Sequence, residues 1–204
     1  MPRTRPSPVP DPAPRKRLDR EQVLATAEAI ADREGWQHLT MTLLAGELGV
    51  KVPSLYNHVP NLEALRGELQ HRTLREMGTA LNRKAMGRVG ETAMRALAAT
   101  FRRYANEHPG RYDLAMQAPV DADGFAAAAT DAGAALGAVI RSYGIDDPTL
   151  ELQLSAFAAL HGVLVLEHSG FFPPMIDIDR VFEHVLDTVL AMLADAAPDE
   201  ARAG

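Results

Sequence analysis

The sequence predicts an all-α fold with one short domain and one larger domain. Apolar residues recur at helical spacing along most of the chain, and no run alternates apolar and polar residues long enough to indicate a strand. Apolar residues make up 47% of the 204 residues but aromatic residues only 5%, and alanine is abundant, which suits closely packed helices. A chain of this length can form a small domain and a larger one.

Composition narrows the class of protein. The chain has no cysteine, so disulfides and thiolate sites are excluded and a reducing compartment is compatible. The longest nearly uncharged apolar stretch, residues 152–166, contains Gln153 and His161 and is too short to span a bilayer. No apolar segment follows the N-terminal arginines, so we expect no secretory signal. The sequence therefore predicts a cytoplasmic protein without a membrane partner.

Charge is distributed unevenly along the chain. The formal net charge is −6, but residues 1–75 carry 11 Lys and Arg against 9 Asp and Glu, whereas residues 76–204 carry 10 against 18. The slightly basic part is therefore the N-terminal one, where binding to phosphates would be placed. The excess is too small to indicate nucleic acid without a motif.

The first 17 residues differ in composition from the rest. They contain six prolines and end in Arg15-Lys16-Arg17, so we expect a disordered or polyproline-like arm. The arm is either a solvated tail or a basic extension that adds phosphate or minor-groove contacts. We divide the chain into this arm (1–17), a short helical domain (18–75) and a larger helical domain (76–204).

Residues that mark the starts and ends of helices occur along the rest of the chain. Asp19 with Gln22 predicts a capping box that starts a first helix, and Gly35 ends it. A longer helix should begin after Pro60-Asn61 and run toward Met86. Glycines, prolines and aspartates then separate further predicted helices at about 89–107, 109–117, 122–143, 148–168 and 178–195.

Residues 40–59 are typical of a helix-turn-helix. Leu44, Ala45 and Leu48 share one face of a short helix, and Gly49 stands where a left-handed residue ends it. Pro53 suits the first turn of the second helix. Leu55 and Val59 share the inner face of that helix. Its outer side chains can hydrogen-bond to phosphates and base edges in a major groove; they are Ser54, Tyr56, Asn57 and His58.

This pattern resembles the TetR family of transcriptional regulators over roughly residues 18–75. The resemblance implies that residues 18–75 are a DNA-binding domain and residues 76–204 a helical regulatory and dimerisation domain. The matching residues are Leu44-Ala45, Leu48-Gly49-Val50, Ser54-Leu55-Tyr56, His58-Val59 and Leu65. The resemblance implies contact with double-stranded operator DNA through Thr40, Thr42, Lys51, Val52, Pro53, Ser54, Tyr56, Asn57 and His58. Tyr56 could instead pack its ring on the first helix. The sequence departs from the family at Leu62, where a phosphate-binding lysine is usual.

A second resemblance lies downstream. Glu107-His108-Pro109-Gly110-x-Tyr112 and Leu160-His161-Gly162 are similar to the regulatory domain of one TetR subgroup, which usually has Trp where this chain has Phe157. A cavity for an unknown small-molecule effector could be lined by Phe101, Tyr104, Met116, Phe125, Tyr143, Phe157 and His161. The same residues are also compatible with an ordinary core.

The last two predicted helices are strongly apolar. Residues 150–165 are apolar nearly all round, which indicates either a buried core helix or a subunit interface. The family resemblance implies a homodimer through a four-helix bundle. The interface residues that we expect are Leu164, Val181, Val185 and Val189.

Catalytic and metal sites are not expected. No histidine has a histidine partner four residues away on a helix, so a metal at His161 is less favoured than a satisfied core or pocket histidine. Ser155 and Ser169 lack a glycine-rich elbow, and no phosphate-binding glycine loop occurs. We expect no enzyme and no cofactor.

The sequence predicts a DNA-binding transcriptional regulator, a repressor released from a near-palindromic operator by a small molecule. The alternative is an all-α small-molecule binding or assembly protein whose DNA binding is weak or lost; Leu62 and the acidic net charge support it.

Overall fold

The computed structural model describes residues 18–198, and every regular element in them is a helix. The predicted arm, residues 1–17, lies outside the described residues. The elements are α1 (Arg20–Glu34), η1 (Trp36–His38), α2 (Met41–Leu48), α3 (Val52–Leu55), α4 (Leu62–Ala85), α5 (Gly90–Glu107), α6 (Pro109–Ala115), α7 (Ala122–Ser142), α8 (Glu151–His168) and α9 (Ile178–Ala196). The predicted all-α class is confirmed for this part of the chain.

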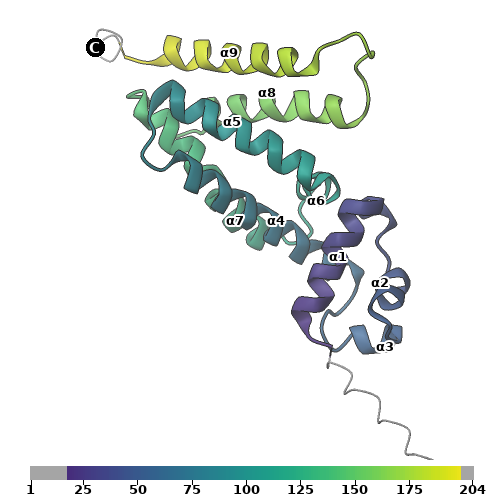
Figure 1. Ribbon diagram of the computed structural model, residues 1–204. Coiled ribbons are helices and arrows are strands. Elements are labelled where there is room, and N and C mark those ends of the chain that lie inside the picture. The colour runs from purple at the N-terminus through teal and green to yellow at the C-terminus, as the bar shows by residue number, and fades with distance from the viewer. Residues whose placement is uncertain (1–17, 199–204) are drawn as a thin grey trace, which may run out of the picture.

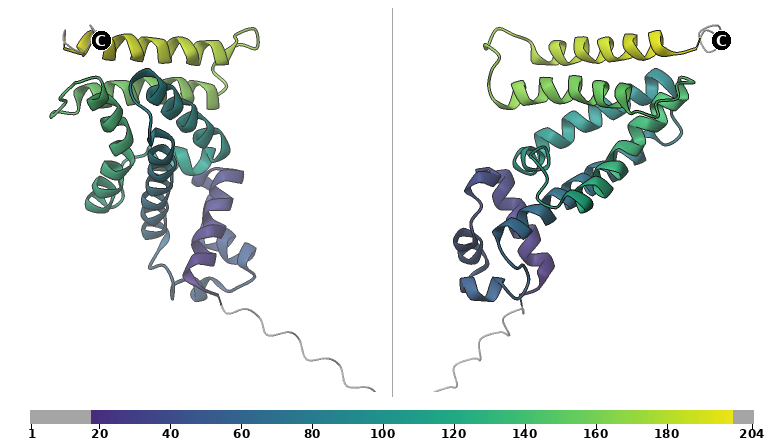
Figure 2. Two further views of the ribbon diagram at one scale, coloured as in Figure 1. Left: turned by 60° about the vertical axis from the view of Figure 1, so that its left-hand side comes forward. Right: turned by 180° about the vertical axis from the view of Figure 1, so that it is seen from behind.

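The helices form a small unit and a larger bundle. Helices α1 to α3 form the small unit, and α4 runs from it into the bundle, where it packs against α5 and α7 (Figure 1). Helices α8 and α9 lie side by side at the end of the molecule farthest from α3, as both views in Figure 2 show. In residues 18–198, no helix combines the length and the apolar character needed to cross a bilayer.

The predicted helix starts are confirmed by their caps. Asp19 and Gln22 form the reciprocal capping box of α1, with the Gln22 N–H donating to Asp19 Oδ1 at 2.8 Å. The Asn61 side chain accepts from the Ala64 N–H at 2.7 Å and starts α4. Gly49 ends α2 at φ 65°, a left-handed conformation that glycine adopts without steric cost. These local hydrogen bonds fix the ends of the small unit's helices.

Two boundaries and one extra element differ from the sequence prediction. Helix α3 ends at Leu55, and residues 56–58 form a turn in which the His58 and Val59 N–H groups both donate to the Leu55 carbonyl. Helix α8 begins at Glu151 rather than 148, since Leu150 is left-handed at φ 59°. The short helix η1 was not predicted.

Two hydrophobic clusters share α4. Leu65 and Leu69 belong to the cluster of α1 to α3, whereas Leu74 and Met77 belong to the cluster of the bundle. A single continuous helix therefore enters both cores. Any rotation of α4 within the bundle must move the small unit with it.

Candidate DNA-binding surface and ligand cavity

The predicted DNA-contacting residues lie at the start of α2 and along residues 51–58. Thr40 caps α2, its hydroxyl accepting from the Leu43 N–H at 3.1 Å. The exposed members of the set are Thr40, Thr42, Lys51, Pro53, Tyr56 and Asn57; Ser54 and His58 are half-buried. Val52 differs from expectation: it is half-buried because it packs against the small unit's core, so little of it faces outward.

The α3 segment is held by two buried side chains. Leu55 and Val59 are 0% and 2% exposed and anchor the segment in the core of the small unit. Tyr56 lies between these anchors in sequence and is 53% exposed. Its ring therefore does not pack fully on α1, and its hydroxyl is available to an external partner.

Three arginines of residues 18–75 form ion pairs with carboxylates of the same region. Arg20 pairs with Glu68 at 3.3 Å, Arg33 with Glu47 at 2.8 Å, and Arg72 with two glutamates of α1. Lys51 is exposed and has no ion pair within residues 18–198. Leu62 packs against the small unit's core, so the start of α4 presents no charge at that position. Phosphate contacts of the α3 segment itself, residues 51–58, therefore depend on Lys51 and uncharged donors.

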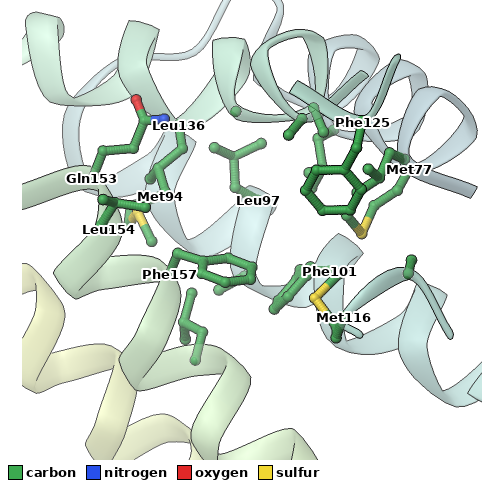
Figure 3. Close-up of a pocket in the computed structure, with 18 residues that line it drawn as sticks. Met77, Met94, Leu97, Phe101, Met116, Phe125, Leu136, Gln153, Leu154 and Phe157 are labelled. Carbon is green, nitrogen blue, oxygen red and sulfur yellow. The ribbon is translucent and has the colours of Figure 1, made fainter. Parts of the chain in front are cut away.

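The bundle contains an apolar cavity of about 340 Å³ between α4, α5, α6, α7 and α8. Figure 3 shows Met77, Phe125 and Met116 at one end and Gln153 and Leu154 at the other. Of the predicted ligand-binding residues, Phe101, Met116, Phe125 and Phe157 line it. The structure thus brings four of the predicted side chains together around one space.

Three other predicted lining residues lie outside this cavity. Tyr104 turns toward α4, where its hydroxyl donates to Glu76 Oε2 at 3.2 Å. His161 turns toward α6, and Tyr143 packs against the bundle core away from the cavity. These three residues therefore do not share the cavity with the other four predicted side chains.

His161 instead belongs to a polar contact between α6 and α8. The Tyr112 hydroxyl lies 2.7 Å from His161 Nδ1, and the ring of Phe157 stacks on His161. Burial lowers the pKa of His161, so its ring is neutral near pH 7 and Nδ1 can accept a hydrogen bond from the Tyr112 hydroxyl. Phe101 meets the Tyr112 ring edge-on with centroids 5.6 Å apart. Two side chains of the cavity therefore touch this pair.

Arg111 of α6 forms ion pairs with Asp32 of the small unit and with Glu76 of α4 in the bundle. Its Nε donates to Asp32 Oδ2 at 2.8 Å, and its backbone N–H donates to Asp32 Oδ1 at 2.9 Å. Nη1 donates to Glu76 Oε2 at 3.0 Å. Arg111 is only 8% exposed; burial alone would lower its pKa, but the Asp32 carboxylate more than compensates and raises it. The guanidinium therefore connects α1 to α4 through α6.

Helix α6 also contacts α1 without side chains. At Gly110 a Cβ atom would lie 1.6 Å from the Ala31 carbonyl oxygen, so only glycine allows this approach. Leu114 of α6 is buried in the core of the small unit, and Tyr112 is buried in the core of the bundle. The role of α6 was missed from the sequence, although the His108-Pro109-Gly110 motif marked its position.

The predicted dimer residues are largely buried within the single chain. Leu164 and Val189 are 0% and 2% exposed because they face the core between α8 and α9, and Val181 and Val185 are half-buried against it. The prediction was therefore wrong for Leu164 and Val189, which have no surface to offer a partner. The exposed face of α8 carries small and apolar residues instead: Leu154, Ser155, Ala158, Ala159, Val165 and Leu166.

Among residues 18–198, no group of three or more His, Asp or Glu side chains is arranged to hold a metal ion.

Comparison with known proteins gives matches to the C-terminal bundle alone and to most of the chain. Residues 94–189 match the model of the tetracyclin repressor-like C-terminal domain. The HTH-type transcriptional regulator Rv0681 of Mycobacterium tuberculosis is 40% identical over 87% of this chain and 81% of its own length. The HTH-type transcriptional repressor DrrR1 of Streptomyces coeruleorubidus is 30% identical over 76% of this chain and 54% of its own length.

Solved structures show the same fold. A protein of unknown function from Rhodococcus sp. RHA1 superposes with a TM-score of 0.73 at 24% identity, covering 89% of this chain and 98% of its own. The TetR family protein ActR of Streptomyces coelicolor, solved in complex with actinorhodin, superposes with a TM-score of 0.64 at 22% identity, covering 90% of this chain and 100% of its own. With a helix-turn-helix joined to a bundle of the matched type, this chain belongs to the TetR family of DNA-binding transcriptional regulators.

Proposed function

We propose that this regulator is a dimeric, cytoplasmic repressor that leaves a near-palindromic operator when a small molecule enters the bundle cavity. The observation that carries the proposal is the position of α6. Its Met116 lines the cavity, its Tyr112 meets Phe101, and its Gly110 lies against Ala31 of α1. A molecule that shifts α6 must therefore shift α1, and with it the recognition segment.

Two finer assignments go with this proposal. His161 and Gly162, with Phe157 in the usual place of Trp, support membership of the His-Gly subgroup of the family. No catalytic role is proposed for His161, whose described polar contact is the one to the Tyr112 hydroxyl. The complex of ActR with actinorhodin supports a ligand role for the bundle, because it shows a member of this fold with a small molecule bound.

The experiment that tests the proposal begins with the operator. Fragments of the organism's genome that the protein retains would supply the operator sequence. Compounds that bind the cavity are then added to the protein–operator complex. Release of the operator at concentrations that fill the cavity supports the proposal, whereas filling without release contradicts it.

Tyr56 is the first site for mutation. We expect Tyr56→Ala to weaken operator binding by roughly 1.5–3 kcal/mol, the range for a lost hydrogen bond to a charged group. The side chain is exposed, so helicity should be retained. Fluorescence anisotropy with labelled operator measures the affinity. Tyr56→Phe is the matched control, because it removes only the hydroxyl; wild-type affinity in both variants would exclude Tyr56 from the interface.

The exposed face of α8 is the proposed dimer surface. We expect Ala159→Glu to give a monomer, because a carboxylate placed within an apolar interface would lose its hydration without a partner. Ala159 is exposed in the single chain, so the variant should keep its helical circular dichroism. Light scattering at micromolar concentration gives the mass. Ala127→Glu on exposed α7 is the control and should stay dimeric; a dimeric Ala159→Glu protein would place the interface elsewhere.

The alternative function, a small-molecule binding protein with weak DNA binding, is favoured by the scarcity of free cations around α3. A salt titration on random duplex separates the two. For a phosphate-binding surface, affinity must fall as salt rises, with a slope of about 0.9 per neutralised phosphate. Binding to duplex that does not change with salt would favour the alternative.

A further inference from the structure

The cavity is almost entirely apolar, and its one polar side chain lies at one end. Leucine, methionine, alanine and phenylalanine side chains form nearly all of the lining, and Gln153 is the only polar side chain among the described lining residues. No ionisable side chain lines it. Figure 3 places the Gln153 carboxamide beyond Leu136, at the end opposite Met116. One end of the cavity can therefore form hydrogen bonds, whereas the rest of it offers only apolar contacts.

Two glycines make room for this carboxamide. A Cβ atom on Gly133 would lie 2.7 Å from Gln153 Nε2, and one on Gly137 would lie 2.7 Å from Oε1. The glycines stand one turn apart on α7, so the amide group lies flat across that turn. Any larger residue at either position would displace it.

The Gln153 carboxamide is free to bind. Its backbone N–H donates to Asp147 Oδ2 at 2.9 Å, which fixes the start of the side chain. The carboxamide itself makes no hydrogen bond to another residue within the described chain. It retains two N–H donors and one carbonyl acceptor for a molecule in the cavity.

The same apolar lining disfavours a charged ligand in the cavity. An ionised group in an apolar cavity loses its hydration, and that loss is not recovered without a counter-ion. Arg141 has its Nη1 3.3 Å from the position of a Cβ atom on Gly137, but Arg141 is exposed to water and is not one of the residues that line the cavity. Three methionines, Met77, Met94 and Met116, add flexible side chains that adapt to different apolar shapes.

We propose that the cavity takes an uncharged, largely apolar molecule with one hydrogen-bonding group, and that Gln153, lying over Gly133 and Gly137, receives that group. This deepens the effector role proposed above. The proposal rests on the effector role only for the claim that binding regulates the protein. Which molecules the cavity binds is decided by the residues that line it.

Three probes that share one ring system test the inference. They are 2-naphthol, naphthalene and 2-naphthoate, which differ only in carrying a hydroxyl, no polar group or a carboxylate. Calorimetry with the full-length protein and no DNA should rank 2-naphthol above naphthalene, with 2-naphthoate weakest. In Gln153→Leu, affinity for 2-naphthol should fall by about 5- to 10-fold, the value of one ordinary hydrogen bond, while naphthalene is unaffected.

A glycine variant tests whether the position of the Gln153 carboxamide matters, because it moves this group without removing it. Gly137→Ala places a methyl group against Oε1, the far end of a flexible side chain, so the protein should fold while preference for 2-naphthol over naphthalene falls. Gly46→Ala is the matched control, because no atom lies within 4 Å of the added Cβ. Its preference should equal that of the unmodified protein.

The outcomes distinguish the two proposals. The inference is overturned if 2-naphthoate binds as tightly as 2-naphthol, if Gln153→Leu weakens all three probes equally, or if none binds. Operator release by 2-naphthol is measured separately. Binding with the predicted ranking but no release would leave the recognition intact and contradict only the effector role.

Discussion

Gly110→Ala is expected to destabilise the protein by about 3 kcal/mol, the upper end of the range for overpacking. The added methyl would lie 1.6 Å from the Ala31 carbonyl oxygen. Both groups belong to or adjoin backbone, so no rotamer change can relieve the clash, and α6 must move away from α1. That movement also withdraws Leu114 from the core of the small unit.

The thermal midpoint measures this effect. For a chain of this size, 3 kcal/mol corresponds to a fall of roughly 6–12 °C at fixed protein concentration. Gly46→Ala serves as the control, because its new methyl meets open space on an exposed helix and should stabilise by about 0.5–1 kcal/mol. An unchanged midpoint for Gly110→Ala would mean that α6 and α1 can separate without cost. Operator affinity should fall with the midpoint, since α1 loses its support.

Arg111→Ala is expected to cost about 3 kcal/mol, near the lower limit for breaking a buried ion pair, because one of the stranded partners is partly solvated. Asp32, whose side chain is mostly buried, would lose the guanidinium that compensates its burial, whereas Glu76 is half-exposed and can recover water. Urea unfolding at fixed protein concentration measures the loss. The double variant Asp32→Asn with Arg111→Met should recover much of it, since no buried charge then remains unpaired.

Arg103 provides the comparison for Arg111. It is an arginine of α5 that is half-exposed and stands 3.9 Å from Glu107. Removing it should change the stability by no more than about 0.5 kcal/mol, as for most surface substitutions. Equal losses from Arg103→Ala and Arg111→Ala would show that the cluster around Asp32 contributes nothing beyond a surface pair.

Local signals predicted the small unit well. Asp19 and Gln22, Gly49 and Asn61 act through hydrogen bonds or backbone conformations that span a few residues, so their effect can be read from adjacent positions. Helix α3 was predicted too long, because the four-residue spacing of Leu55 and Val59 fits a further helical turn, whereas residues 56–58 form a turn outside the helix.

Long-range contacts could not be predicted in the same way. Helical spacing identified Leu164 and Val189 as apolar but could not say that α8 and α9 of the same chain cover them. It also assigned His161 to the cavity, whereas the hydroxyl of Tyr112, 49 positions away, holds it elsewhere. Gly110 could be recognised in the sequence only as a glycine after a proline, because its role depends on Ala31 lying against it in the fold.

The insertion of Leu114 into the core of the small unit has a consequence for protein engineering. The helix-turn-helix cannot be excised at the end of its own sequence and grafted as a cassette, because one of its core side chains comes from 45 positions farther along, beyond Leu69. A chimaera that joins residues 18–75 to an unrelated sensor would leave a hole where Leu114 stood. A working hybrid must carry α6, with Gly110 and Arg111, from the same parent as α1.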